Sequence, residues 1–332
     1  MTERDSYIDF LRFVGITLIV IAHVNAPFTI TQIRSFDVPL MVFVSGLSFS
    51  GKEVSPSWAS FYYPRIKRLL IPVYFFLSIY FLGWLIIGKP DSVEEVLGSY
   101  LLLESPSIGF VWIIKVFLLI MVLTPWLIKL NKRFNMGLFL LLILMLLALQ
   151  EIIVLAYRYY SPVTLIGQFT KESFSGIAGY SIPFLFGLRF RNVDNKIEQI
   201  TLVSVSFLFL ISAGAYICQY GCPIEISPRF KYPPYRYFIV YGTGVSVILW
   251  ILRNYLKVFS SNKFVLFVGR NTIWIYLWHI PFVYIANRFI DGWVIRYCIA
   301  YIGAILCFSL QFFVVEKVRN RYSLKVLKYF IG

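Results

Sequence analysis

Long apolar runs recur along the whole chain and are separated by short polar stretches. A helix of about 20 apolar residues crosses roughly 30 Å of hydrocarbon, and ten runs of about that length are present. They lie at residues 8–26, 34–50, 69–88, 109–128, 137–157, 174–190, 200–220, 236–252, 272–288 and 294–315. The pattern predicts an all-α, polytopic integral membrane bundle of about ten transmembrane helices. The second, sixth and eighth runs are short or interrupted by Pro and Gly, which is also compatible with a re-entrant segment.

The stretches between the runs are too short to hold a soluble domain, and no internal repeat is visible. Residues 1–332 are therefore predicted to form a single membrane domain with no attached soluble domain. The first run is predicted to be an uncleaved span, because no small-residue cleavage site follows it. Any chemistry must then be carried out by the helical bundle itself.

The composition agrees with a membrane protein, since 59% of the residues are hydrophobic and 14% are charged. A net charge of +15 is also typical of nucleic-acid-binding proteins, but in a membrane protein Lys and Arg first report topology. Most of them fall in loops on the same side as the N-terminus. This asymmetry predicts cytoplasmic N- and C-termini and needs no nucleic-acid partner. The four cysteines lack metal-ligand spacing, so no metal site is predicted.

A few ionisable side chains interrupt the apolar runs: Arg12, His23, Lys115, Glu151 and His279. A charge at membrane depth costs at least about 2.5 kcal/mol, so such residues usually face a polar interior and are candidates for function. Arg12 and His23 are eleven residues apart, which on a helix is three turns plus roughly 20°. Both side chains are therefore predicted to lie on one face, about 16 Å apart along the helix axis.

Structural roles explain the same residues in other ways. Arg12 would extend to the inner membrane interface and pair with Asp9, one helical turn before it. Each histidine would be a hydrogen-bonded packing residue, and Lys115 would form an ion pair with Glu151. The combination of these residues argues against purely structural roles, because both histidines of the chain lie in apolar runs and His23 shares a helix face with Arg12. Imidazole moves protons at neutral pH, and arginine binds phosphate or carboxylate groups.

A basic cluster, "YYPRIKRLLIPVYFF", opens the third run. Arg65 and Arg68 are three residues apart and share one face if the segment is helical. They are explained either as topological charges on the cytoplasmic side or as a cradle for the phosphates of an anionic ligand.

Four segments together resemble the acyltransferase family 3 of integral membrane acyltransferases. They are "RFVGITLIVIAH" in the first run, "FVSGLSFSGK" in the second, "RIKRLLIPVYFF" at the start of the third and "GRNTIWIYLWHIPF" in the ninth. The resemblance covers the whole chain. Some members of the family carry an additional extracytoplasmic domain, which this sequence is not expected to have.

The resemblance implies an activity and roles for several residues. It implies transfer of an acyl group from cytoplasmic acyl-CoA, usually acetyl-CoA, to hydroxyl groups of cell-surface polysaccharides or their lipid-linked precursors. It also implies that Arg12 and His23 are the signature pair, with His23 as catalytic base, and that Arg65 and Arg68 hold the donor. His23 would act either as a base in direct transfer or as a covalent acyl carrier.

Other candidates for substrate binding rest on their chemistry. Lys115 would stabilise an oxyanion or bind an acidic sugar, and Trp112 would stack on a sugar ring. Glu151 and His279 are included because they are ionisable and lie inside apolar runs.

The sequence thus predicts an O-acyltransferase, most simply an O-acetyltransferase, in the bacterial inner membrane. Its expected partners are acyl-CoA, a polysaccharide or lipid-linked sugar acceptor, and membrane lipids. A proton-coupled transporter or flippase of a glycan or lipid intermediate is the alternative of another class, although no repeat symmetry between halves supports it. N-acyl transfer to an amino sugar is a second alternative.

Overall fold

The computed structural model describes residues 5–52, 54, 56–160, 162–191, 193–220, 231, 233–322 and 325–331. No strand occurs among these residues, and nearly all of them belong to helices or the turns between them. The predicted fold class, a polytopic all-α membrane protein, is confirmed.

Each of the ten apolar runs overlaps one helix over most of its length. The long helices are α1 (Ser6–Ala22), α3 (Asp37–Phe49), α4 (Tyr63–Ile86), α6 (Trp112–Arg133), α7 (Met136–Tyr159), α8 (Leu165–Arg191), α9 (Lys196–Tyr220), α10 (Arg236–Ile251), α13 (Thr272–Phe289) and α14 (Trp293–Tyr322). Shorter elements are α2 (Phe28–Ile33), η1 (Trp58–Tyr62), α5 (Val93–Tyr100), α11 (Arg253–Leu256), η3 (Lys257–Ser261), α12 (Lys263–Arg270) and η4 (Lys325–Tyr329).

Fewer helices qualify as membrane spans by length and composition alone than the ten runs predict. Within the described residues, five do so: η1 with α4, α6, α7, α9 and α14; a sixth is added if α10 and the segment Arg253–Ser261, bent by 63°, form one span. Helices α1 and α3, with 17 and 13 residues, are too short for this test. Helices α8 and α13 are long enough, but they are too polar.

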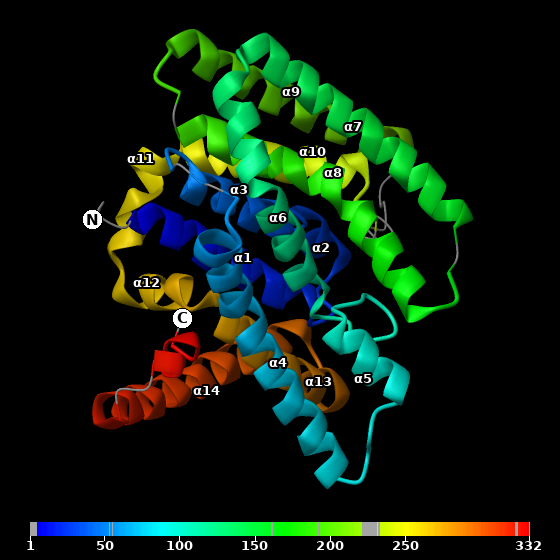
Figure 1. Cartoon of the computed structure of the whole chain (residues 1–332), viewed down its shortest axis with the longest axis vertical. Helices are drawn as coiled ribbons and strands as arrows, with labels where there is room; N and C mark the ends of the chain where they lie inside the picture. Colours follow the sequence, from blue (N-terminus) through cyan, green and yellow to red (C-terminus); the bar gives the residue numbers. More distant parts are fainter. Residues whose placement is uncertain are drawn as a thin grey trace.

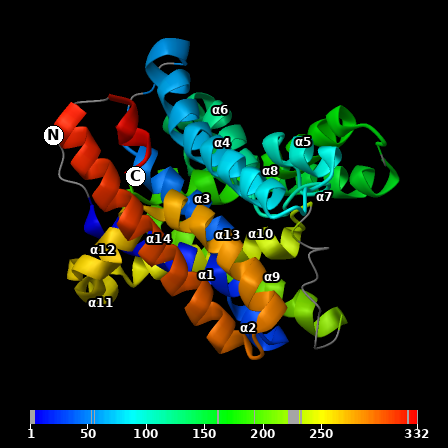
Figure 2. The same cartoon turned by 90° about the horizontal axis from the view of Figure 1, so that it is seen from below.

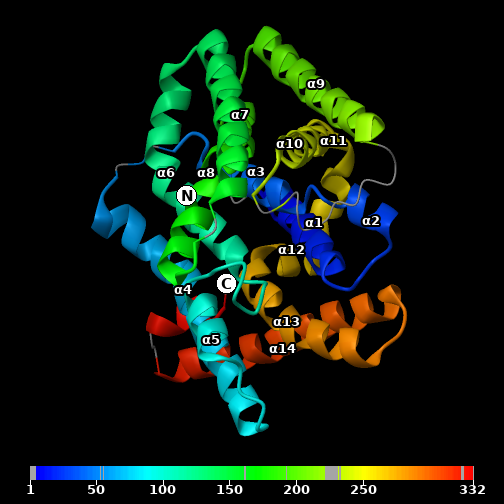
Figure 3. The same cartoon turned by 90° about the vertical axis from the view of Figure 1, so that its right-hand side faces the viewer.

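The helices that fail this test form the inside of the bundle. Helix α3 packs against α8, α1 and α10, and every residue of 178–189 on α8 is buried. Helices α1 and α3 lie in the middle, with α7 to α10 on one side and α13 and α14 on the other (Figures 1 and 3). An interior helix faces protein all round, so its polar residues avoid the lipid.

Glycines set the distance between α3 and α8. A Cβ atom at Gly46 would overlap the carbonyl oxygen of Phe184, and one at Gly187 would overlap that of Phe43. The two backbones therefore pack in direct contact, as small residues allow in membrane bundles.

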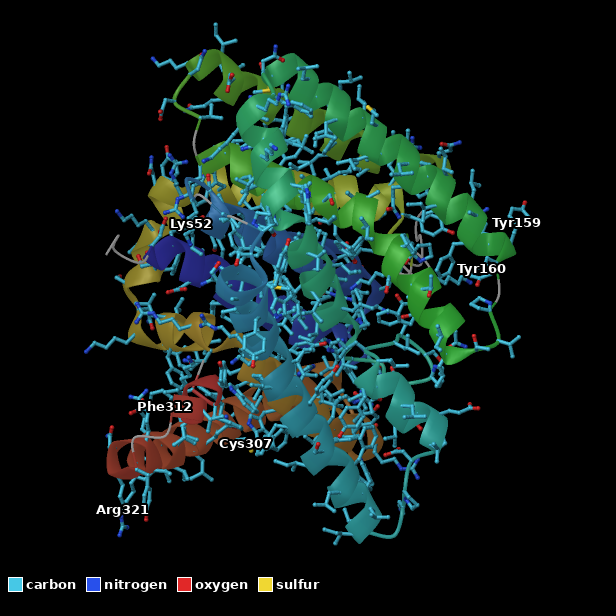
Figure 4. All side chains as sticks on the ribbon, in the orientation of Figure 1. Lys52, Tyr159, Tyr160, Cys307, Phe312 and Arg321 are labelled. Carbon is cyan, nitrogen blue, oxygen red and sulfur yellow. The ribbon has the colours of Figure 1, made fainter. Side chains whose placement is uncertain are left out.

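Two opposite sides of the molecule hold different connecting segments. The start of α1, helices α11 and α12, and η4 lie on one side, whereas α2 and α5 lie on the other (Figures 1 and 2). Lys52 is on the first side, and Tyr159 and Tyr160 are at the far end of α7 (Figure 4). The start of α1 and η4, which lie near the two termini, are thus on the same side of the molecule as Lys52.

Candidate active site

A cavity of about 890 Å³ opens among α1, α3, α4, α6 and the α12–α13 junction. This volume lies within the range of roughly 300–1,000 Å³ found for sites that bind small molecules and cofactors. Its cationic lining residues are Arg12, Lys52, Arg65, Arg68, Arg191 and Arg270, and Asp5 is the carboxylate in the lining. Its apolar lining includes Ile16, Ile19, Met41, Ile113, Ile114, Phe117 and Met121.

One face of α1 forms a wall of this cavity. Ile8, Arg12, Ile16 and Ile19 line it in turn, at the spacing of a single helical stripe. His23 follows Ile19 by one turn and caps the C-terminal end of α1. The prediction that Arg12 and His23 share a face agrees with this stripe.

A buried aspartate holds two of the arginines. The Asp9 side chain is fully buried and accepts hydrogen bonds from Arg12 Nη1 at 2.9 Å and Arg270 Nε at 3.1 Å. Arg12 also donates to Ser48 Oγ at 2.9 Å. The predicted pairing of Arg12 with Asp9 is therefore present, but Arg12 faces the cavity as well.

Arg65 and Arg68 both line the cavity from the first turns of α4, so the prediction that they share one face is confirmed. Arg65 donates to the Phe61 carbonyl at 2.9 Å, and its guanidinium lies 4.1 Å from the centre of the Phe61 ring. Stacking on an aromatic ring restrains the guanidinium. The helix begins with Pro64 in its first turn, where the missing N–H costs nothing.

Three cationic residues of the cavity were missed by the sequence analysis: Lys52, Arg191 and Arg270. Lys52 follows α3, whereas Arg191 and Arg270 are the last residues of α8 and α12. Lys and Arg are expected at such positions on topological grounds alone. Lys52 and Arg270 do lie in two of the segments that resemble the family, but the resemblance implied no role for either. Burial, together with the positive charges of Arg191 and Arg65, lowers the pKa of Lys52 below its usual range. The cluster is therefore under repulsion that an anion would relieve.

The two histidines of the chain form a pair next to the inner end of the cavity. His23 Nδ1 and His279 Nε2 are 2.9 Å apart, within hydrogen-bond distance. His279 is fully buried, and its Nδ1 is hydrogen-bonded to the Tyr276 carbonyl. Tyr276 itself lines the cavity, so the residue that binds His279 Nδ1 also contacts the cavity.

Further contacts fix the position of His23. Asn287 Nδ2 donates to the His23 carbonyl at 2.8 Å, and the Phe110 ring meets the imidazole edge-on with centres 4.7 Å apart. The hydroxyl of Tyr276 donates to the Phe110 carbonyl. His23, at the end of α1, is thus held in position by contacts from α13 and from the segment before α6.

Lys115 and Trp112 line a different, much smaller cavity of about 20 Å³, which is room for about one water molecule. Lys115 is buried and forms an ion pair with Glu172, whose carboxylate also accepts from the Glu104 backbone N–H. The structure does not bring these two candidates together with His23 in one cavity.

The alternative pairing of Lys115 with Glu151 is wrong. Glu151 lies on α7 with its side chain 39% exposed, and its partner is Arg236 at 3.5 Å. Lys115 pairs instead with Glu172, which the sequence analysis passed over because it lies just before the sixth apolar run.

A second ion cluster was also missed. The carboxylate of Asp37 pairs with Arg34 at 2.6 Å and with Lys231 at 3.5 Å. Burial lowers the pKa of Lys231 to about 8, although Asp37 opposes this shift. Lys231 also lines the small cavity with Lys115.

Across the part of the chain that the structure describes, no group of three or more His, Cys, Asp or Glu side chains is placed to hold a metal ion. The features that remain are a cationic cavity with an apolar wall and a buried histidine pair beside it. Together with the fold, they define a helical membrane protein with a cationic cavity.

The family comparison identifies the class of chemistry. The family model described as an acyltransferase domain, that of acyltransferase family 3, matches residues 5–311. The chain belongs to this family and is a membrane acyltransferase. No curated protein and no solved structure shows a significant match to it.

Proposed function

We propose that the protein transfers an acyl group, most simply acetyl, from acyl-CoA to a hydroxyl group of a cell-surface polysaccharide or its lipid-linked precursor. The observation that carries the proposal is the large cavity, which combines six cationic side chains with an apolar wall and ends beside the histidine pair. The proposed location is the bacterial inner membrane, with both termini in the cytoplasm.

An acyl-CoA matches the two halves of this cavity. Its nucleotide carries several phosphate groups, and its long pantetheine arm ends in the thioester. Positive charge for the phosphates comes from Arg12, Lys52, Arg65, Arg68 and Arg191. Each guanidinium can donate two parallel N–H hydrogen bonds to two oxygens of one phosphate, and the lysine supplies a point charge. The apolar wall from Ile16 to Ile19 leads the arm toward His23.

The reaction follows from this placement. The acceptor hydroxyl gives its proton to His23 while its oxygen attacks the thioester carbonyl. The new C–O bond forms, the C–S bond breaks, and the CoA thiolate takes the proton from His23. The products are an ester and free CoA, and His23 returns to its starting state.

Isolated membranes with radiolabelled acetyl-CoA and the host's glycan test this function. Wild-type protein is expected to place label on the glycan in a form released by mild alkali, and His23→Ala to abolish labelling with unchanged protein level. Ser204→Ala, an exposed change on α9 outside the cavity, serves as the control and keeps full activity.

Each other outcome points elsewhere. Label that resists alkali indicates N-acyl transfer, and label trapped on His23 indicates a covalent acyl-histidine. Unlabelled glycan from membranes that bind acetyl-CoA contradicts the acetyl donor. Movement of the glycan across vesicles without any label indicates transport.

A further inference from the structure

The hydrogen bonds of the two histidines determine which ring nitrogens carry protons. A backbone carbonyl only accepts, so His279 must donate to the Tyr276 carbonyl from Nδ1. In a neutral imidazole the other nitrogen then has no proton and accepts. His279 Nε2 is therefore an acceptor, and the proton in its contact with His23 belongs to His23 Nδ1.

In the part of the chain that the structure describes, this series of hydrogen bonds leaves Nε2 of His23 without a hydrogen-bond partner. With Nδ1 of His23 donating to His279, the Nε2 of the neutral His23 ring carries a lone pair. His23 is partly exposed, whereas His279 is fully buried. Among the described residues, no side chain or backbone group forms a hydrogen bond with His23 Nε2.

We propose that His279 is a positioning residue that holds His23 in the Nδ1–H tautomer, so that Nε2 of His23 is the nitrogen that removes the proton from the acceptor. The chain Tyr276 carbonyl, His279, His23 does for this imidazole what a buried carboxylate does for the histidine of a serine-protease triad. The proposal rests on the proposed function and deepens it.

The same arrangement assists the charged state of the reaction. When His23 Nε2 takes the hydroxyl proton, the ring becomes an imidazolium and its Nδ1–H becomes a stronger donor. The bond to His279 Nε2 then strengthens, because hydrogen bonds from ionised donors are stronger than neutral ones. His279 keeps its own proton throughout, because its Nδ1 stays bonded to the Tyr276 carbonyl.

A spectroscopic test does not depend on catalysis. The chain contains two histidines, so ¹⁵N-histidine labelling of purified protein in detergent gives a simple imidazole spectrum at a pH where both rings are neutral. Both rings are expected to show a protonated Nδ1 and an unprotonated Nε2, the tautomer that is less common in free histidine. A protonated Nε2 on either ring overturns the proposal.

A matched pair of variants tests the positioning role. The Gln side chain places its terminal atoms near Nε2 of the histidine it replaces, and Asn places them near Nδ1. His279→Gln therefore keeps an acceptor for His23, whereas His279→Asn keeps the contact with the Tyr276 carbonyl but does not reach His23.

We expect His279→Asn to lower kcat on the order of 100-fold, as when a histidine loses the partner that fixes its tautomer. Its KM for acetyl-CoA should be unchanged, and His279→Gln should restore most of kcat. Equal kcat values in the two variants overturn the positioning role. If the spectrum is as expected but wild-type protein transfers no acyl group, the proposed function has failed and the tautomer assignment stands.

Discussion

At the scale of single residues, Asp9 organises the cationic cavity. It is fully buried and pairs with both Arg12 and Arg270. Breaking a buried ion pair costs about 3–5 kcal/mol, but these arginines are 27% and 46% exposed, so water replaces part of the loss. Asp9→Asn is expected to destabilise the protein by about 1–2 kcal/mol and to raise KM for acyl-CoA, because Arg12 loses its fixed position.

Thermal unfolding in detergent and donor-dependent kinetics check this expectation. Asp5→Asn, at a cavity carboxylate whose contact with Arg191 is longer at 3.9 Å, should have a smaller effect on the unfolding temperature. An Asp9→Asn protein with wild-type unfolding and KM would contradict the role of Asp9.

Lys52 predicts a pH dependence of donor binding. Burial and the neighbouring cations lower its pKa, so its charge is lost at a lower pH than that of an ordinary lysine. Affinity for acyl-CoA should then fall as pH rises through this lowered pKa. Lys52→Arg should flatten the decline, because a guanidinium stays charged. Equilibrium binding from neutral to alkaline pH measures this effect, and identical profiles for both proteins would count against it.

Variants of Lys115 test whether this residue serves in an ion pair or binds substrate. Its side chain and that of Glu172 are 5% and 6% exposed, so Lys115→Met leaves a buried carboxylate without its cation. We expect a loss of about 3–5 kcal/mol in stability, partly recovered in the Lys115→Met, Glu172→Gln double variant. If Lys115→Met unfolds as wild type and only raises KM for the acceptor, Lys115 binds substrate instead.

At the scale of elements, glycines allow the backbones of α3 and α8 to pack in direct contact. Gly46→Ala or Gly187→Ala adds a Cβ against the opposing backbone, and overpacking of this kind costs about 1–3 kcal/mol. Gly214→Ala on α9 is the control, since its Cβ meets no atom within 4 Å and alanine favours the helix. Unfolding temperatures should fall for the first two variants and hold or rise for the third.

The elements themselves were accessible from the sequence, because each apolar run is long enough to form one helix. Which helices lie inside was not, because the apolar runs show that helices form but not how they pack. The Pro and Gly in the runs that became α3, α8 and α10 were interpreted as signs of a re-entrant segment, whereas α3 and α8 pack at the centre of the bundle. The stripe on α1 was predicted because helix periodicity fixes it. The His23–His279 contact was not, because it depends on how α1 and α13 pack against each other.

The predicted ion-pair partner of Lys115 was wrong for a related reason. Lys115 and Glu151 were paired because both interrupt apolar runs, whereas the actual partner, Glu172, lies just before the sixth apolar run and so was not considered. Similarly, Lys52, Arg191 and Arg270 come from three separate loops or helix ends, and only the fold brings them to one cavity. The distribution of Lys and Arg predicted a cytoplasmic side for these three residues, but it did not predict that they line the same cavity.

At the scale of the whole molecule, the cavity and the chain ends give the enzyme a direction. Lys52 lies on the side that also holds the start of α1 and η4 (Figures 1 and 4), and the distribution of Lys and Arg predicts that this side is cytoplasmic. The anionic donor should therefore enter from the cytoplasm, because CoA does not cross a lipid bilayer.

Sealed vesicles of known orientation test this directly. Inside-out vesicles, which expose the cytoplasmic face, should use added acetyl-CoA, whereas right-side-out vesicles should do so only after permeabilisation. Arg68→Ala should raise KM for the donor about 10-fold or more in inside-out vesicles, since one charge-assisted phosphate contact is worth roughly 1.5–3 kcal/mol. Higher activity in intact right-side-out vesicles than in intact inside-out vesicles would show that the donor reaches the cationic cavity from the outer face and would overturn the topology with cytoplasmic termini.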